Sequence, residues 1–139
     1  MIGIEALYLN VWQQGVHCGH AGLEKIIDFL EKSLGMPLNT PMNRDTFAFC
    51  NYFIAKPIFW NDYFSFVDQA LHLLDQELTK NTDVGMAYAG TGSYHRDTNI
   101  TMKPFIIERL FSTFIQNSRL KVASFRYSKN FYEAKFGVK

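Results

Sequence analysis

The sequence predicts one α/β domain, with a tendency towards α+β, in which about three main helices pack on a small sheet of three or four strands. Three observations predict this fold. Apolar residues recur at helical spacing in three segments, residues 47–55 are rich in the aromatic and β-branched residues of buried strands, and residues 120–127 alternate as a strand does. A chain of 139 residues fits a single domain spanning residues 1–139.

The first third of the chain predicts a short strand, a helix and a loop. Apolar residues alternate with others between Ile2 and Leu9, as in a short strand. In residues 23–34 the apolar positions follow helical spacing, and Gly35 is suited to end that helix. Proline and asparagine recur in residues 37–45, which indicates a loop.

The middle of the chain predicts a strand, a helix and a long loop. The strand of residues 47–55 is limited by Pro57. Asn61 or Asp62 can cap the next helix, which we expect to run to about Leu78. Residues 81–101 carry several glycines and polar residues, so they predict a loop. A loop of this length inside a compact domain is usually functional or partly disordered.

The last predicted helix carries the main candidate for chemistry. Pro104 suits its first turn, and the helix is expected to run to about Gln116. Glu108 lies at the rim of its apolar arc, whereas Arg109 points away from that arc. A carboxylate at the rim must be paired, hydrogen-bonded or used, because its desolvation is costly.

Two interpretations of Glu108 follow from this position. As a structural group it would tie the long loop to the helix, with Lys56 or Arg96 as its partner. As a functional group it would line a substrate cleft and act as the candidate catalytic residue. In the long loop, Gly90, Gly92, His95 and Arg96 form a poor phosphate-binding motif, because the Gly-Lys-Ser/Thr ending of a P-loop is missing. They fit a lid better, since glycines permit hinge movement.

Two further groups of residues are candidate sites. His17, Cys18 and His20 are potential metal ligands, but their spacing does not let adjacent side chains converge on one ion. A loop with incidental histidines is favoured, so no metal site is predicted. The aromatic residues between 47 and 63 could form a sugar-stacking platform, although core packing explains most of them. Trp60 and Tyr63 are the expected exposed exceptions.

Composition excludes several classes of protein. The net charge is +1 and the basic residues are scattered, which argues against a nucleic-acid-binding protein. The 2 cysteines form no disulfide framework, so a reducing, cytoplasmic setting is expected. No apolar run reaches the ~20 residues that span a bilayer, so no transmembrane segment is predicted. Location at the periphery of the inner membrane stays open.

Three segments carry a resemblance to a known family. Residues 49–57 (FCNYFIAKP), 59–63 (FWNDY) and 103–111 (KPFIIERLF) resemble the C-terminal part of bacterial glycosyltransferase-like proteins from capsule and lipopolysaccharide loci. The resemblance is strongest over residues 47–126. It implies a GT-A-like α/β fold in which an N-x-F-x-x-K strand and an F-x-x-E-R-L helix lie near a sugar-nucleotide site. It also implies that Asn51, Lys56 and Arg109 bind substrate, with Glu108 at the same site, and Trp60 is placed beside them.

The chain departs from that family in one respect. It contains no Asp-x-Asp motif, which would hold Mg²⁺ or Mn²⁺ on the diphosphate of a sugar nucleotide. No cofactor is therefore evident, and either ion is expected only if the transferase interpretation holds. Whether the chain is an enzyme stays undecided.

Two functions from different classes remain. The first is a glycosyltransferase-like module of surface-polysaccharide biosynthesis, a fragment or degenerate relative that binds a sugar nucleotide or glycan. The second is a non-catalytic interaction and assembly module that self-associates as a homo-oligomer or joins a partner subunit.

Overall fold

The computed structural model describes residues 7–48, 53–91, 100–118 and 120–122. This part of the chain contains five helices and no strand. The helices are α1 (Val11–His17), α2 (Leu23–Leu34), α3 (Pro57–Thr79), α4 (Asp83–Ala89) and α5 (Lys103–Asn117). Within these residues, the one β-type pairing is an isolated antiparallel bridge between Thr91 and Thr101. The predicted α/β fold, with helices on a sheet, is therefore wrong.

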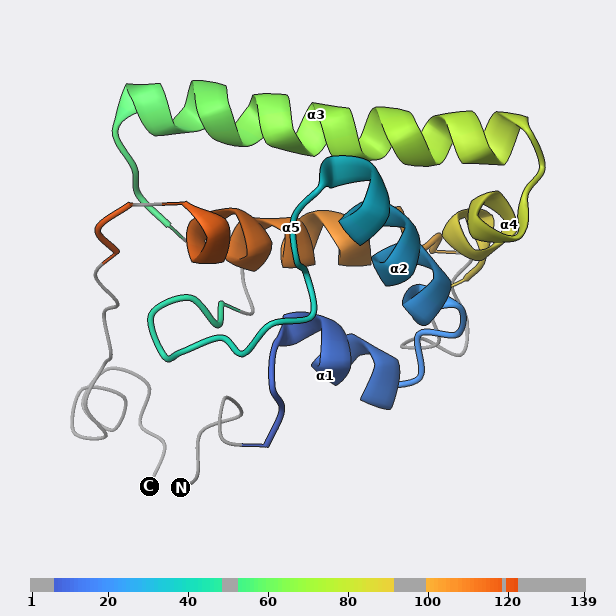
Figure 1. The fold of residues 1–139 in the computed structure, drawn as a ribbon, viewed down its shortest axis with the longest axis horizontal. Coiled ribbons are helices and arrows are strands. Elements are labelled where there is room, and N and C mark those ends of the chain that lie inside the picture. Colours follow the sequence, from blue (N-terminus) through green and yellow to red (C-terminus); the bar gives the residue numbers. More distant parts are fainter. Residues whose placement is uncertain (1–6, 49–52, 92–99, 119, 123–139) are drawn as a thin grey trace, which may run out of the picture.

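α5 lies between α3 and α1 and contacts both. Figure 1 shows α3 extended along one side of the molecule, with α5 running beneath it in the opposite direction. α1 lies on the other side of α5, α2 runs from α1 towards α3, and α4 folds back under the end of α3 (Figure 1). The start of α3 and the end of α5 consequently lie at the same end of the molecule.

α2 forms where the sequence predicted it. Its buried residues are Leu23, Ile26, Ile27 and Leu30, spaced so that they share one face. Gly35 ends the helix in the left-handed conformation, with φ of 63°, which suits glycine. This helix and its glycine stop are confirmed.

The predicted strand of residues 47–55 is not formed in its described part. Residues 47, 48 and 53–55 have no strand structure, and residues 49–52, which include Asn51, lie outside the described residues. The ring of Phe53 stacks on Phe111 of α5, with a centroid distance of 3.7 Å. A short apolar run cannot by periodicity alone be assigned to a sheet, and here its described side chains pack on helices.

α3 is longer than predicted at its N-terminal end. It begins at Pro57 after Lys56, so neither Asn61 nor Asp62 caps it. Proline at the first helical position lacks only an N–H that would have no helical partner there. Its end at Thr79 agrees with the expected end near Leu78.

α4 occupies part of the predicted long loop. The Thr82 hydroxyl accepts a hydrogen bond from the Gly85 backbone N–H at 3.1 Å and caps the helix. Gly85 lies directly against the backbone of α3: a Cβ there would meet the carbonyl of Glu77 and come within 2.5 Å of the Leu78 Cα. The loop prediction is therefore wrong for residues 83–89.

The two outer strands predicted from alternation also fail in their described parts. Residues 7–9 and 120–122 have no strand structure. The rest of each prediction, residues 2–6 and 123–127, lies outside the described residues. α1 was not predicted, and its N-cap Asn10 accepts a hydrogen bond from the Gln13 N–H at 2.8 Å.

α5 confirms the helix predicted from Pro104 to Gln116, but it buries two faces. One is apolar and includes Ile106 and Leu110, both fully buried. The other is polar and consists of Arg109, Ser112 and Thr113, each at most 4% exposed. A helix with both faces buried must lie at the centre of the fold, because its polar face needs partners from other elements.

Gly85→Ala tests the contact between α3 and α4. The added methyl group has no space, so we expect a loss of about 1–3 kcal/mol in unfolding free energy, measured by urea denaturation. Gly90→Ala is the matched control, because φ there is −60° and its nearest contact would be 3.1 Å. Equal effects of the two substitutions would contradict the close packing described here.

Candidate functional site

Arg109 is the most enclosed charged side chain of the described part of the chain, with 4% exposure. Its Nε donates to the Val11 carbonyl at 3.0 Å, and its Nη2 donates to Gln14 Oε1 at 2.9 Å. Its Nη1 donates to the Phe105 carbonyl at 2.8 Å. The first two bonds join α5 to α1, which lies about a hundred residues earlier in the chain, and the third lies within α5. A buried cation is tolerated when its donors are satisfied in this way.

Gly15 makes room for this guanidinium. A Cβ at this position would lie 2.5 Å from Arg109 Nε and 2.7 Å from Nη2. Glycine here has its ordinary helical place in α1, so its role is steric: it lets α1 approach α5 closely. The need for glycine at this position lies in the tertiary contact.

A seam of hydrogen bonds continues along the polar face of α5. Trp12 Nε1 donates to Thr113 Oγ1 at 2.7 Å, which links α1 and α5 a second time. The Ser112 hydroxyl bonds both the N–H and the carbonyl of Ala48, each at 3.0 Å. Further along, Thr46 Oγ1 donates to Gln116 Oε1 at 2.6 Å. Ala48 belongs to the segment that was predicted to be a strand. Its backbone N–H and carbonyl are bonded by a side chain of α5 and not by a neighbouring strand.

Glu108 lies beside Arg109 at the edge of a small cavity. The cavity has a volume of about 10 Å³ and is lined by Val11, Gln14, Ala48, Glu108 and Arg109. Burial raises the pKa of the Glu108 carboxyl, and the positive charge of Arg109 opposes this shift. The space is that of about one water molecule. The position of Glu108 at the rim of the buried face agrees with the sequence analysis, while its catalytic role stays a prediction.

His20 adds a third titratable group to this region. It is 2% exposed, and its ring lies against Phe105 with a centroid distance of 4.4 Å. Burial, and to a smaller extent the charge of Arg109, lower the pKa of His20 below its ordinary 6.5. The imidazole is therefore neutral at pH 7. Of these three groups, Glu108 and Arg109 line the cavity, which has no room for a ligand larger than one water molecule.

Lys56 and Trp60, two of the other predicted substrate-binding residues, do not line the cavity beside Glu108. Lys56 is exposed and precedes α3 as its N-cap. Trp60 is half-buried, with its ring stacked on Phe53 at a centroid distance of 5.0 Å. Gly90 follows α4 and donates its N–H to the Ala87 carbonyl. The predicted residues Asn51, Gly92, His95 and Arg96 lie outside the described residues, so their roles stay predictions.

The candidate metal ligands are placed at the end of α1. Gln14 Nε2 donates to Cys18 Sγ at 2.9 Å, and His17 Nδ1 lies 3.1 Å from the Gln13 carbonyl. Within the described ranges, no three His, Cys, Asp or Glu side chains are grouped so that they could hold a metal ion.

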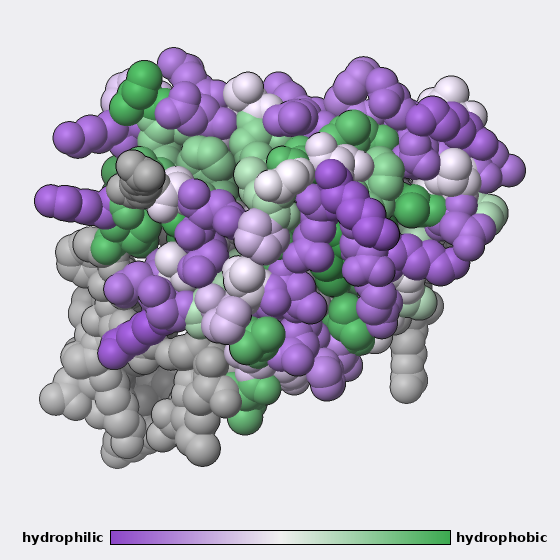
Figure 2. Space-filling view, in the orientation of Figure 1, coloured by the Kyte–Doolittle hydropathy of each residue, from purple (hydrophilic) through white to green (hydrophobic). Residues whose placement is uncertain are grey.

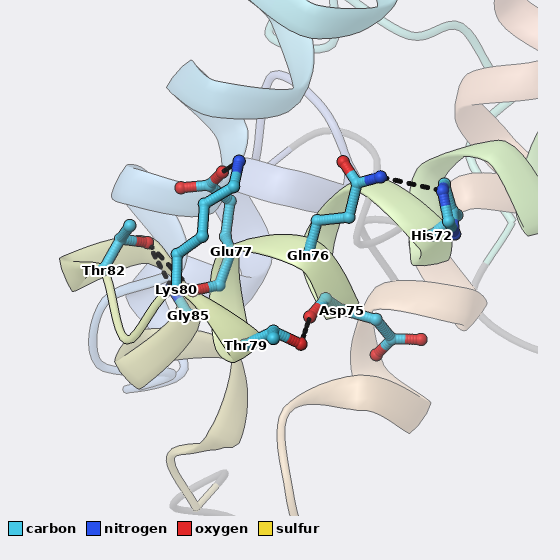
Figure 3. A network of polar contacts seen from close by, with 8 residues as sticks. All are labelled: His72, Asp75, Gln76, Glu77, Thr79, Lys80, Thr82 and Gly85. Atoms are coloured by element: carbon cyan, nitrogen blue, oxygen red, sulfur yellow. Dashed lines mark hydrogen bonds and ion pairs between the residues drawn. The ribbon is translucent and has the colours of Figure 1, made fainter.

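A second concave region lies on the later half of α3. Its lining residues are His72, Asp75, Gln76, Thr79 and Lys80, around an open hollow of about 430 Å³. Figure 3 shows the polar contacts of this helix end, in which Gln76 Nε2 and His72 Nε2 lie 2.9 Å apart and Lys80 pairs with Glu77 at 2.8 Å. All lining residues come from one helix, so no second element encloses a ligand there. His72 is exposed.

Exposed apolar side chains gather where α3 begins. Ile54 is fully exposed, Ile58 is 67% exposed and Phe64 is 54% exposed. Figure 2 shows apolar surface between polar residues at this end of the molecule. Of the two predicted exposed aromatic residues, Trp60 is half-buried and Tyr63 is buried at 4% exposure. The exposed ring is that of Phe64, which the sequence analysis missed because it lies at the edge of the apolar face.

Comparison of the chain with protein-family models, with curated proteins and with solved structures gives no match. The resemblance to glycosyltransferase-like proteins therefore stays a prediction. Among the helices in the described part of the chain, none combines the length and apolar character that crossing a membrane requires.

Arg109→Met tests the link between α1 and α5. The substitution keeps most of the side-chain volume but removes three charged donors, so we expect a loss of about 2–4 kcal/mol in unfolding free energy. Arg44→Met is the matched control, because Arg44 is exposed and loses the same charge. Urea denaturation of both variants gives the comparison; an Arg109→Met variant as stable as the control would contradict the assigned role.

Glu108→Gln tests the electrostatic state of the rim carboxylate. The folded pKa of Glu108 lies above its ordinary 4.5, so the ionised group disfavours folding at pH values above the raised pKa. We expect Gln to raise the melting temperature at pH 7 by about 1–3 °C. The gain should shrink as pH falls from the raised pKa to below 4.5, where the wild-type carboxyl is protonated in both states.

The control for this titration is Glu24→Gln, on the exposed face of α2. Melting curves of both variants between pH 4 and pH 8 are compared with those of the wild type. A lower melting temperature of Glu108→Gln at pH 7 would show instead that the ionised carboxylate stabilises the fold.

Proposed function

We propose that the chain is a non-catalytic interaction and assembly module whose copies associate through the start of α3. The observation that carries the proposal is the group of exposed apolar side chains Ile54, Ile58 and Phe64, here called the α3-start surface. Full burial of each such side chain contributes about 1.5–3 kcal/mol of favourable free energy. For exposed side chains this contribution is gained only when the chain associates with a partner. Exposed apolar patches with a polar rim mark protein interaction sites.

The α3-start surface rests on a rigid base. Behind it, Phe53, Phe59 and Tyr63 pack with Phe111 and Phe114 of α5 at centroid distances between 3.7 and 6.2 Å. Phe64 contacts the Trp60 ring at 5.4 Å and the Tyr63 ring at 5.8 Å. Rings held in this way lose little side-chain entropy on binding, which favours their use at interfaces.

The size of the Glu108 cavity also supports an interaction module. Pockets for drug-sized ligands and cofactors have volumes of about 300–1,000 Å³. The cavity beside Glu108 has about 10 Å³, and the hollow on α3 is open. Within the described residues, neither offers an enclosed site for a sugar nucleotide. A cytoplasmic setting is part of the proposal, as the small number of cysteines indicated.

A glycosyltransferase-like module is the second proposal. The observation that favours it is the half-buried Glu108 with its raised pKa beside Arg109, because acid–base residues are often tuned in this way. It is tested by a thermal-shift screen against sugar nucleotides with and without Mn²⁺. Ligand at 100 times its Kd should add about 2.7 kcal/mol of stability. A flat result with every sugar nucleotide would remove this second proposal.

Sedimentation velocity over a range of concentrations tests the assembly module. We expect reversible oligomers of the wild type, and at least about tenfold weaker association when Ile58→Ser and Phe64→Ser are combined, because a loss of 1.4 kcal/mol already gives tenfold. Met86→Ser is the control, since Met86 is 52% exposed but lies on α4. A monomeric wild type, or equal association of all variants with unchanged circular dichroism, would contradict the proposal.

A further inference from the structure

We propose that the association is head-to-tail: the outer face of α3 in one copy binds residues 119–139 of a second copy. This inference rests on the proposed assembly function and identifies the occupant of the surface. It is argued from the charge of α3, from the spacing of its exposed side chains, and from the composition of residues 119–139.

The exposed face of α3 is acidic. The helix sequence contains four acidic residues and no lysine or arginine. Asp75 lies 3.7 Å from Lys103, and Glu77 pairs with Lys80. Asp62 and Asp68 are exposed, and no basic group in the described part of the chain forms an ion pair with either. A partner that covers this face must therefore neutralise two carboxylates.

The two carboxylates accompany the exposed apolar side chains. Asp62 stands four residues after Ile58, and Asp68 stands four residues after Phe64. Residues with this spacing are neighbours on a helix surface. Each apolar contact is thus followed by an acid one turn later, which suits a partner that combines apolar rings with cations.

A second copy of α3 does not meet this requirement. Two such faces packed together would bring the Asp62 and Asp68 carboxylates of both copies into one interface. Like charges placed together across an interface cost several kcal/mol. The symmetric contact of α3 with α3 is therefore disfavoured, although the apolar side chains alone would allow it.

The chain itself carries a segment of the required chemistry. Residues 119–139 contain six basic residues and one acid, a net charge of +5 (6 − 1). The same segment contains five aromatic residues: Phe125, Tyr127, Phe131, Tyr132 and Phe136.

Length and position also fit. The first half of α3 covers roughly 18 Å, whereas 21 extended residues span up to about 70 Å. Leu120 and Val122, described residues within the first part of the segment, are 45% and 36% exposed. They follow α5, whose end lies at the same end of the molecule as the start of α3 (Figure 1). Because copies are proposed to associate, the segment is assigned to a second copy; such a heterologous contact builds rings or open chains.

A charge-swap experiment on the full chain tests this assignment. One variant carries D62K and D68K on α3, and the other carries K129E and K135E. Sedimentation velocity should show self-association at least about tenfold weaker than wild type for each variant alone. An equimolar mixture should regain association between unlike copies, because the unchanged acidic α3 of the second variant then meets the unchanged basic segment of the first. The control variant E24K/D28K has the same charge change on the exposed face of α2 and should associate like the wild type.

The outcomes separate this inference from the function on which it rests. A wild type that stays monomeric at every concentration overturns both. If the wild type associates and both charge variants associate equally well, the assembly function stands and the head-to-tail contact is overturned. If the folded variants lose association but the mixture does not regain it, the head-to-tail contact is likewise overturned. Binding of the segment to α3 of its own chain would overturn it too.

Discussion

The fold depends on one buried cation, the guanidinium of Arg109. Removing a charge from water is costly, so its donors must meet acceptors in fixed places. Two of these acceptors, the Val11 carbonyl and Gln14 Oε1, belong to α1. The requirement therefore fixes how α1 lies on α5, and the missing side chain at Gly15 gives the guanidinium its space. The glycine in α1, the close contact of the two helices and the bonded guanidinium therefore depend on one another.

α5 connects this contact to the rest of the core through its two buried faces. Its polar face continues from Arg109 through Ser112 and Thr113, which bond Ala48 and Trp12. Its apolar face meets the aromatic side chains of α3, and Phe111 stacks on Phe53, which precedes α3. A helix with one hydrogen-bonded face and one apolar face restricts the position of its neighbours more than a wholly apolar helix would, because each hydrogen bond needs a particular partner. The exposed start of α3 is then a rigid platform rather than a loose end.

Sequence alone predicted the elements whose pattern is local. α2 and α5 were recognised from helical spacing and from their glycine and proline signals. The strand at residues 47–55 was wrong in its described part, because aromatic residues favour strands on average but pack here on helices. α4 was missed, since glycine at position 85 indicated a loop; its reason is the backbone of α3, which only the folded chain brings near.

The candidate site shows the same division. Glu108 was placed at the rim of a buried face, and it lies there. Arg109 was expected to point away from the apolar arc of its helix, but its burial on the polar face was not predicted. Its acceptors on α1 lie 98 and 95 residues away and leave no local signal. Phe64 is a large apolar residue, yet it is 54% exposed. Exposure at the edge of a helix face depends on the neighbouring element, which periodicity does not contain.

Native-state hydrogen exchange tests the central role of the contact between α1 and α5 most directly. If Arg109 holds both helices in one cooperative unit, the hydrogen-bonded amides at the end of α1 should exchange through the same global unfolding as those of Leu110 to Ile115. Their exchange free energies should then be equal and fall together as urea is added. Amides of α1 that exchange through a separate, lower-energy opening, while α5 stays protected, would contradict this account.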